Sequence, residues 1–97
     1  MKVLFLKQAQ AETDDAVAWY SSQSQGLGTY FLDEIDRAIR RIKTFPLASP
    51  EIETGLRRCL LSRFPYGIIY GVDSGLIIVV AVAHLHREPR YWTERLP

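Results

Sequence analysis

The chain has 97 residues and carries 12 Lys and Arg against 11 Asp and Glu, so its formal net charge is only +1. Hydrophobic residues make up 47% and charged residues 24%, values that exclude a disordered or collagen-like chain. This length suits a simple core, so we expect a single domain over residues 1–97 with two layers at most.

A short strand and a helix are the first predicted elements. Residues 3–6, VLFL, form a β-prone apolar run, which predicts a strand. From Ala9 to about Gln23, apolar residues recur at helical spacing. Thr13, Asp14 and Asp15 lie early in this segment, where carboxylates favour a helix N-terminus. The pattern therefore predicts a first helix.

The next segment has the clearest helical periodicity. It follows a Gly-Leu-Gly break, and its apolar residues fall on one stripe: Leu27, Phe31, Ile35, Ala38, Ile39, Ile42 and Phe45. Acidic residues precede basic residues along it, which is the order that the helix dipole favours. Pro46 ends this second helix, and residues 47–55 are expected to form a loop.

Three strand-like runs follow, at residues 56–63, 67–72 and 76–83. Asp73-Ser74-Gly75 predicts a turn between the last two, which are therefore antiparallel. The expected order is β-α-α-β-β-β. It describes an α+β two-layer domain in which an antiparallel sheet carries both helices on one face.

The run at 76–83, LIIVVAVA, is apolar at every position, so both faces of this strand require burial. Two helices cover only one face. The C-terminal tail, a second copy or a partner protein must cover the other, and we expect a partner. Trp92, next to Tyr91, is expected to anchor the tail onto the sheet.

Charge is unevenly distributed. Residues 1–36 hold two Lys against six acids, a balance of −4, and residues 37–97 hold ten Lys and Arg against five acids, a balance of +5. A basic second half suits a polyanion or an acidic protein, although pairing between the halves gives the same counts. The candidate contacts to a target or nucleic acid are Arg57, Arg58, Arg63, His84, His86, Arg87, Arg90 and Tyr91.

Strand alternation predicts that Arg57 and Arg63 share one face. Three roles are open for the histidines. A metal site lacks convincing third and fourth ligands, so no metal and no cofactor is expected. An RNA-cleaving site needs a base, an acid and arginines that hold the charge developing on phosphorus; Arg57, Arg63 and His84 are its candidates. The third alternative is that the histidines cap the strand and contact carbonyls or a partner.

The cellular setting is also predicted from composition. Cys59 is the single cysteine, which excludes an intramolecular disulfide and favours a reducing compartment. No apolar run approaches the roughly 20 residues that span a bilayer. We therefore expect a cytoplasmic protein without membrane contact.

Two stretches carry a resemblance to a known family. LRRCLLSRFPYGIIY at 56–70 and AVAHLHREPRYW at 81–92 resemble the C-terminal half of the RelE/ParE toxin superfamily of bacterial type II toxin–antitoxin systems. The shared patterns are FPY-x-x-x-Y and His84-x-x-Arg87-x-Pro89. The strand and two helices that end in FPLASP agree with the first half of that superfamily.

The resemblance implies a cytoplasmic, growth-inhibiting toxin of a plasmid-stabilisation type, held inactive by a cognate antitoxin whose C-terminal segment packs on the sheet and helices. The apolar residues that this antitoxin is expected to contact are Leu76, Ile78, Val80, Val82, Trp19 and Tyr20. Both a homodimer and a toxin–antitoxin heterotetramer are compatible with the resemblance.

Relatives that resemble RelE cleave mRNA on the ribosome, and those that resemble ParE inhibit DNA gyrase without a known hydrolytic centre. Here the penultimate strand begins Pro65-Tyr66-Gly67, without the arginine that ribonuclease members tend to carry. This favours a ParE-like toxin that acts on gyrase. A RelE-like ribosome-dependent mRNA endonuclease and a non-toxic homodimeric binding module are the alternatives, and whether the protein is an enzyme stays open.

Overall fold

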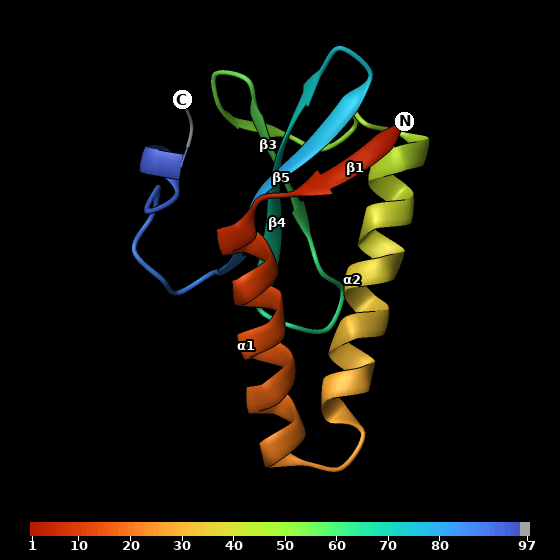
Figure 1. The fold of residues 1–97 in the computed structure, drawn as a ribbon, viewed down its shortest axis with the longest axis vertical. Coiled ribbons are helices and arrows are strands. Elements are labelled where there is room, and N and C mark those ends of the chain that lie inside the picture. The colour runs from red at the N-terminus through yellow and green to blue at the C-terminus, as the bar shows by residue number, and fades with distance from the viewer. Residues whose placement is uncertain (96–97) are drawn as a thin grey trace.

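The computed structural model describes residues 1–95. In them the chain forms two α-helices and five strands, followed by a short 3-10 helix at Thr93–Arg95. Along the chain these are β1 (Lys2–Phe5), α1 (Lys7–Gln23), α2 (Leu27–Thr44), β2 (Glu51–Glu53), β3 (Leu56–Leu60), β4 (Tyr66–Asp73) and β5 (Leu76–His84). Figure 1 shows the two helices as an antiparallel hairpin whose turn projects beyond the sheet.

The strands form one mixed sheet in the order β1-β5-β4-β3-β2. The pairs β2–β3, β3–β4 and β4–β5 are antiparallel, as predicted, whereas β1 lies parallel to β5. The prediction of a wholly antiparallel sheet is therefore wrong for β1. In Figure 1, α2 ends near the start of β1. β3 begins at that same end of the sheet and β4 runs back toward it. The next strand, β5, therefore runs in the same direction as β1.

Two predicted boundaries in this part of the chain also change. The segment predicted as a loop contains β2, whose pairing with β3 is short and irregular. The run predicted as one strand over 56–63 ends at Leu60, because Leu61 and Phe64 turn into the core. Arg63 consequently lies outside the strand, and the face that it was expected to share with Arg57 does not exist.

Both helices cover the same face of the sheet, as predicted. The apolar stripe of α2 is buried at Phe31, Ile35, Ala38 and Ile42, and these side chains pack with residues of β4 and β5: Ile68, Tyr70, Ile77, Val79 and Val82. Phe45 follows the last turn of α2 and is the exception on the stripe, since 67% of it is exposed. None of the helices in residues 1–95 is long and apolar enough to cross a membrane.

A β-bulge in β5 changes which side chains share a face. Tyr70 pairs with Val79 and Ile69 pairs with Ala81, so Val80 is an extra residue in β5. Beyond Val80, each side chain of β5 points to the face opposite to the one that strict alternation from the start of the strand predicts, because a bulge inserts one residue into one strand only. Val80 lies on the face away from the helices, and Val82 packs on the helix side.

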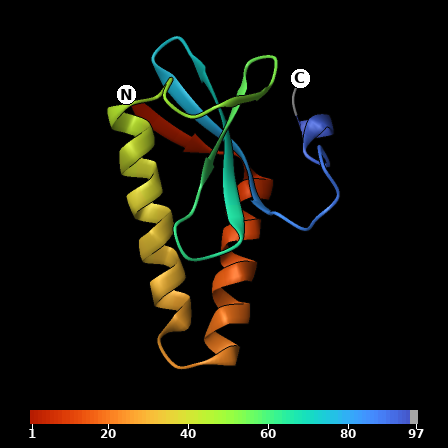
Figure 2. The same ribbon diagram turned by 180° about the vertical axis from the view of Figure 1, so that it is seen from behind.

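The face away from the helices is covered in its centre by the chain's own tail. Trp92 is only 6% exposed and packs with Leu56, Ile69 and Val80. The predicted anchoring by Trp92 is confirmed, and the expectation that a partner must cover this part of the sheet is wrong. The tail suffices because one indole buries a large apolar area. Figures 1 and 2 show the tail on the α1 side of the molecule, opposite α2.

Candidate functional site

The three residues considered for RNA cleavage are each held by local contacts. The Arg57 side chain donates from Nη1 to the Leu47 carbonyl at 3.0 Å and to the Ser49 carbonyl at 2.7 Å, which fixes the loop after α2. Arg63 donates to the Tyr30 hydroxyl and lies beside its ring. His84 ends β5, where its ring contacts Tyr66 at a centroid distance of 5.0 Å.

One ring nitrogen of His84 is already engaged in a hydrogen bond. Its Nδ1 accepts the backbone N–H of His86 at 3.1 Å, so the neutral imidazole carries its proton on Nε2. The lone pair that a general base needs is therefore already occupied. The two imidazoles are neighbours, with ring centroids 5.3 Å apart.

Arg57 and His84 are also not brought together. Along β4, Tyr66 pairs with His84 and Tyr70 pairs with Arg57. Four residues of strand span about 13 Å, and Arg57 lies two strands from His84, about 10 Å across the sheet. Arg57 and His84 are therefore too far apart to hold one phosphate group. Among residues 1–95 there is also no group of three His, Cys, Asp or Glu that suits a metal ion.

Arg87, Arg90 and Tyr91 take part in contacts between the tail and the rest of the molecule. Arg90 lies 3.5 Å from a Glu53 carboxylate oxygen. The Arg87 guanidinium lies over the Tyr91 ring, 3.8 Å from its centroid. The Tyr91 hydroxyl donates to Glu12, and Arg87 also reaches Glu12 at 3.5 Å. His86 and Arg58 are exposed.

Glu12 is the centre of this network, and the sequence pattern gave it no role beyond a charge on the first helix. Its Oε1 accepts the Val82 N–H at 3.0 Å and the Arg95 guanidinium at 2.8 Å. Burial alone would raise the pKa of Glu12, but the hydrogen bonds from Arg95, Tyr91 and Val82 outweigh burial and hold that pKa below its ordinary value. Burial and the Glu12 carboxylate raise the pKa of Tyr91.

The same network closes the part of the β5 edge that β1 does not reach. The pairing of β1 with β5 ends at Phe5 and Val79. Beyond it, Glu12 accepts from Val82 N–H and Arg95 donates to the Val80 carbonyl at 2.9 Å. These two backbone groups are thereby paired within the chain and are not free to pair with another strand.

Trp19 and Tyr20, the predicted antitoxin contacts on α1, lie in different surroundings. Trp19 is 58% exposed and borders a small hollow of about 290 Å³ together with Tyr66 and His84. Tyr20 is half-buried and stacks on Phe31 with ring centroids 5.3 Å apart. Of the predicted contacts on β5, Leu76 and Ile78 are half-buried, whereas Val80 and Val82 are buried.

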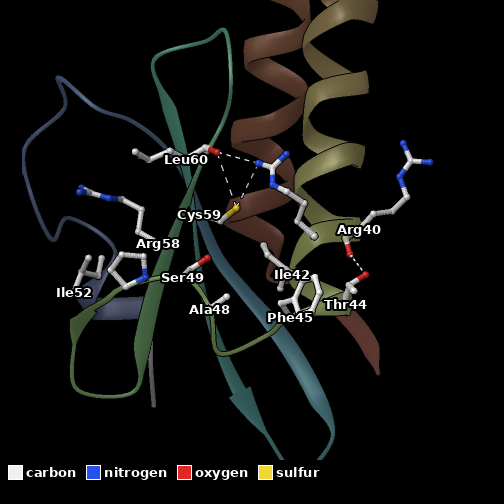
Figure 3. Close-up of a pocket in the computed structure, with 12 residues that line it drawn as sticks. Arg40, Ile42, Thr44, Phe45, Ala48, Ser49, Ile52, Arg58, Cys59 and Leu60 are labelled. Carbon is white, nitrogen blue, oxygen red and sulfur yellow. Dashed lines mark hydrogen bonds between the residues drawn. The ribbon is translucent and has the colours of Figure 1, made fainter.

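A larger hollow lies on the other side of the molecule, and no predicted apolar contact belongs to it. It has a volume of about 630 Å³ and separates the end of α2 and the following loop from β2 and β3 (Figure 3). We call it the β3 trough. It is lined by Arg40, Arg41, Ile42, Thr44, Phe45, Ala48, Ser49, Pro50, Ile52, Arg58, Cys59 and Leu60.

The β3 trough combines an apolar floor with a cationic rim. Phe45 and Leu60 are 67% and 51% exposed, which is unusual for large apolar side chains that line one hollow. Arg40, Arg41 and Arg58 are exposed at its border, and the lining includes no acidic residue. Figure 3 shows Arg40 and Arg58 on opposite sides of the trough. The available signal was Phe45, a large apolar residue directly before the Pro46 that ends the predicted helix.

Comparison with known proteins identifies the family. A family model described as "ParE toxin of type II toxin-antitoxin system, parDE" matches residues 3–89. The chain belongs to the ParE toxin family. Among solved structures, a chain from the "Chromosomal ParDE TA system from P. aeruginosa" is similar, with a TM-score of 0.65 and 16% sequence identity. The match covers 89% of this chain and 97% of that chain, and it supports the same fold.

The match confirms the resemblance to the RelE/ParE superfamily on its ParE-like side, and with it the α+β fold class. Membership of the ParE toxin family supports the type II toxin class. Among curated proteins, no sequence matches the chain significantly.

Proposed function

We propose that this chain is the toxin of a type II toxin–antitoxin pair and that it acts by binding DNA gyrase rather than by cutting mRNA. The family match over residues 3–89 supports the toxin role. The observations that carry the binding mechanism are the separation of Arg57 from His84 across the sheet and the local contacts in which Arg57, Arg63 and His84 are already engaged.

In this proposal a cognate antitoxin restrains the toxin in the cytoplasm, and the β3 trough is its main docking site. The trough presents Phe45 and Leu60 to solvent beside three arginines, and exposed apolar side chains in a hollow are typical of a protein-binding surface. The half-buried Leu76 and Ile78, and the exposed Trp19, are secondary candidates for antitoxin contact.

Induction of the full chain in bacteria tests the toxin role. We expect growth arrest when the chain is expressed alone and recovery when the product of the neighbouring reading frame is expressed with it. Unimpaired growth, with a folded chain present in the cells, would contradict the proposal.

Two assays with purified chain then separate the mechanisms. We expect gyrase to lose supercoiling activity as the chain is added, and programmed ribosomes to show no new cuts in A-site mRNA. Cuts that disappear in His84→Ala or Arg63→Ala would establish the RelE-like alternative instead. A symmetric homodimer that affects neither gyrase nor ribosomes would identify a non-toxic binding module.

A further inference from the structure

The hollow beside Trp19 lies on the helix side of the sheet, where α1 passes the start of β4 and the end of β5. We call it the Trp19 hollow, and it is bordered by Trp19 on α1, Tyr66 on β4, His84 on β5 and Arg87 in the tail. Its volume of about 290 Å³ lies near the lower end of the sizes of small-molecule pockets, about 300–1,000 Å³. The hollow therefore suits one small planar group.

Two aromatic rings stand at the border of the Trp19 hollow. Trp19 is 58% exposed, and within residues 1–95 its aromatic contact is a T-shaped one with Tyr20. Tyr66 is half-buried and contacts His84 in the same T-shaped way. Single exposed apolar side chains are ordinary on protein surfaces. An exposed indole at the border of a hollow, however, offers a large flat face on which a planar ligand can stack.

His84 and Arg87 bring hydrogen-bond donors to the same hollow. Because His84 Nδ1 accepts the His86 N–H at 3.1 Å, the Nε2 of its neutral ring carries the proton and donates. The Arg87 guanidinium reaches Glu12 through one nitrogen at 3.5 Å, and its side chain is 55% exposed. Further N–H groups of Arg87 therefore remain for a ligand. An oxyanion such as a phosphate suits this pair of donors.

Two carboxylates also line the hollow, and they differ in what they offer to a ligand. Glu12 is already engaged by Arg95 and Tyr91, so its charge is balanced within the chain. Asp15 is exposed and lies one turn before Trp19 on α1. It repels an anion on its own side of the hollow and accepts the exocyclic amino group of a base. A ligand that joins an anionic group to a planar ring with amino groups meets these demands.

We propose that the Trp19 hollow binds one unpaired nucleotide, with the base against the indole of Trp19 and the phosphate against Arg87 and His84. Proteins that bind single strands combine aromatic side chains, on which bases stack, with cationic groups along the backbone. A base within a duplex cannot enter such a hollow without leaving its stack. A cationic ligand fits less well, since the Arg87 guanidinium lies in the same hollow. The inference goes beyond the proposed function, and it holds whether or not the chain is toxic.

The two tryptophans of the chain make fluorescence a direct measurement of this binding. Trp19 is 58% exposed and Trp92 is 6% exposed, so a base that stacks on Trp19 quenches its emission while Trp92 stays shielded. We expect a single-stranded DNA oligonucleotide of mixed sequence to quench the full chain, and the duplex of the same sequence to bind about 10-fold more weakly or less. The same titration with an RNA strand and with a nucleoside monophosphate identifies the source of the nucleotide.

Substitutions separate a built site from general attraction of a polyanion. Trp19→Ala removes the stacking face and should weaken binding of a dye-labelled single strand about 10-fold or more, whereas Trp19→Phe, which keeps a ring, should weaken it less. Arg87→Ala should lower the affinity and reduce the slope of log affinity against log salt by about 0.7. Lys43→Ala removes an exposed cation of α2 outside the hollow and should change the affinity less than about 2-fold.

Several outcomes would overturn the inference. These are the absence of quenching by any of the nucleotides, equal affinity for single strand and duplex, and equal losses in Arg87→Ala and Lys43→Ala. Quenching or shielding of Trp19 by the product of the neighbouring reading frame, without any response to nucleotides, would assign the hollow to a protein and also overturn it. If Trp19→Ala does not fold, quenching of the unmodified chain decides, because Trp92 is buried.

The remaining outcomes separate this inference from the proposed function. Preference for the DNA strand, for the RNA strand or for the free nucleotide supports the inference and names the source. Growth arrest by a chain that binds no nucleotide overturns the inference and leaves the toxin role intact. Nucleotide binding in the Trp19 hollow by a chain that does not arrest growth supports the inference and contradicts the toxin role.

Discussion

Replacing Glu12 with Gln removes the one negative charge that holds the tail to α1 and β5. Glu12 accepts from two Arg95 nitrogens, at 2.8 and 3.0 Å, and also from Tyr91 and from Val82 N–H. The amide of Gln retains one acceptor for Val82 but turns an NH₂ group toward donors. Hydrogen bonds to charged groups each contribute about 1.5–3 kcal/mol, and Arg95 regains part of this by moving into solvent. We expect a loss of about 2–3 kcal/mol at pH 7.

The same substitution has a predicted pH dependence. The ordinary pKa of this carboxyl is 4.5, and the folded state lowers it. The folded chain therefore binds this proton less readily than the unfolded chain. The contribution of Glu12 is fully present above the unfolded pKa and is lost as pH falls through the folded pKa. The stability difference between the native chain and Glu12→Gln should shrink below about pH 4.

Urea unfolding followed by tryptophan fluorescence between pH 7 and pH 3.5 measures this difference. For a domain of this size, 2–3 kcal/mol corresponds to a fall in melting temperature of about 10–20 °C. Asp15→Asn, an exposed carboxylate one turn farther along the same helix, is the matched control and should change stability by less than about 0.5 kcal/mol. A similarly small effect of Glu12→Gln at pH 7, or one that does not vary with pH, would refute the reasoning.

Three further substitutions probe the packing. Trp92→Ala should cost about 3 kcal/mol and create binding of an apolar dye, since it uncovers the sheet; unchanged dye binding would contradict tail coverage. Gly28→Ala should cost about 1–3 kcal/mol in thermal unfolding, because a Cβ there would lie 2.6 Å from the Val17 carbonyl oxygen; native stability would argue against this close helix crossing. Tyr70→Phe should cost about 1 kcal/mol in urea titration by removing the 2.7 Å bond to the Pro46 carbonyl, and no cost would show that bond to be dispensable.

Local periodicity predicted the elements that depend on nearby residues. The apolar stripe on α2 and the turn at Asp73-Ser74-Gly75 could be predicted because helix and hairpin patterns depend on residues only a few positions apart. The parallel pairing of β1 with β5 could not be predicted from local patterns, since it depends on the end of the sheet at which the chain leaves the helical hairpin. The bulge at Val80 leaves no mark in a run that is apolar at every position.

The candidate site was predicted less well than the fold, for a physical reason. The β3 trough joins α2, a loop and two strands, and it exists because β2 covers only the start of β3. Such a difference in strand length cannot be derived from side-chain patterns. The role of Glu12 could likewise not be predicted, because its partners Tyr91 and Arg95 lie about 80 positions farther along the chain.

Neutralisation of growth arrest by the antitoxin tests the central claim most directly. Phe45 is largely exposed in the trough, so Phe45→Asp should leave folding and toxicity intact while placing a negative charge on the apolar floor of the proposed antitoxin site. We expect cells expressing Phe45→Asp to stop growing and not to recover with the neighbouring gene product, whereas cells expressing Leu32→Asp, a control at an exposed apolar position outside the trough, recover. Equal recovery of both variants would contradict the account.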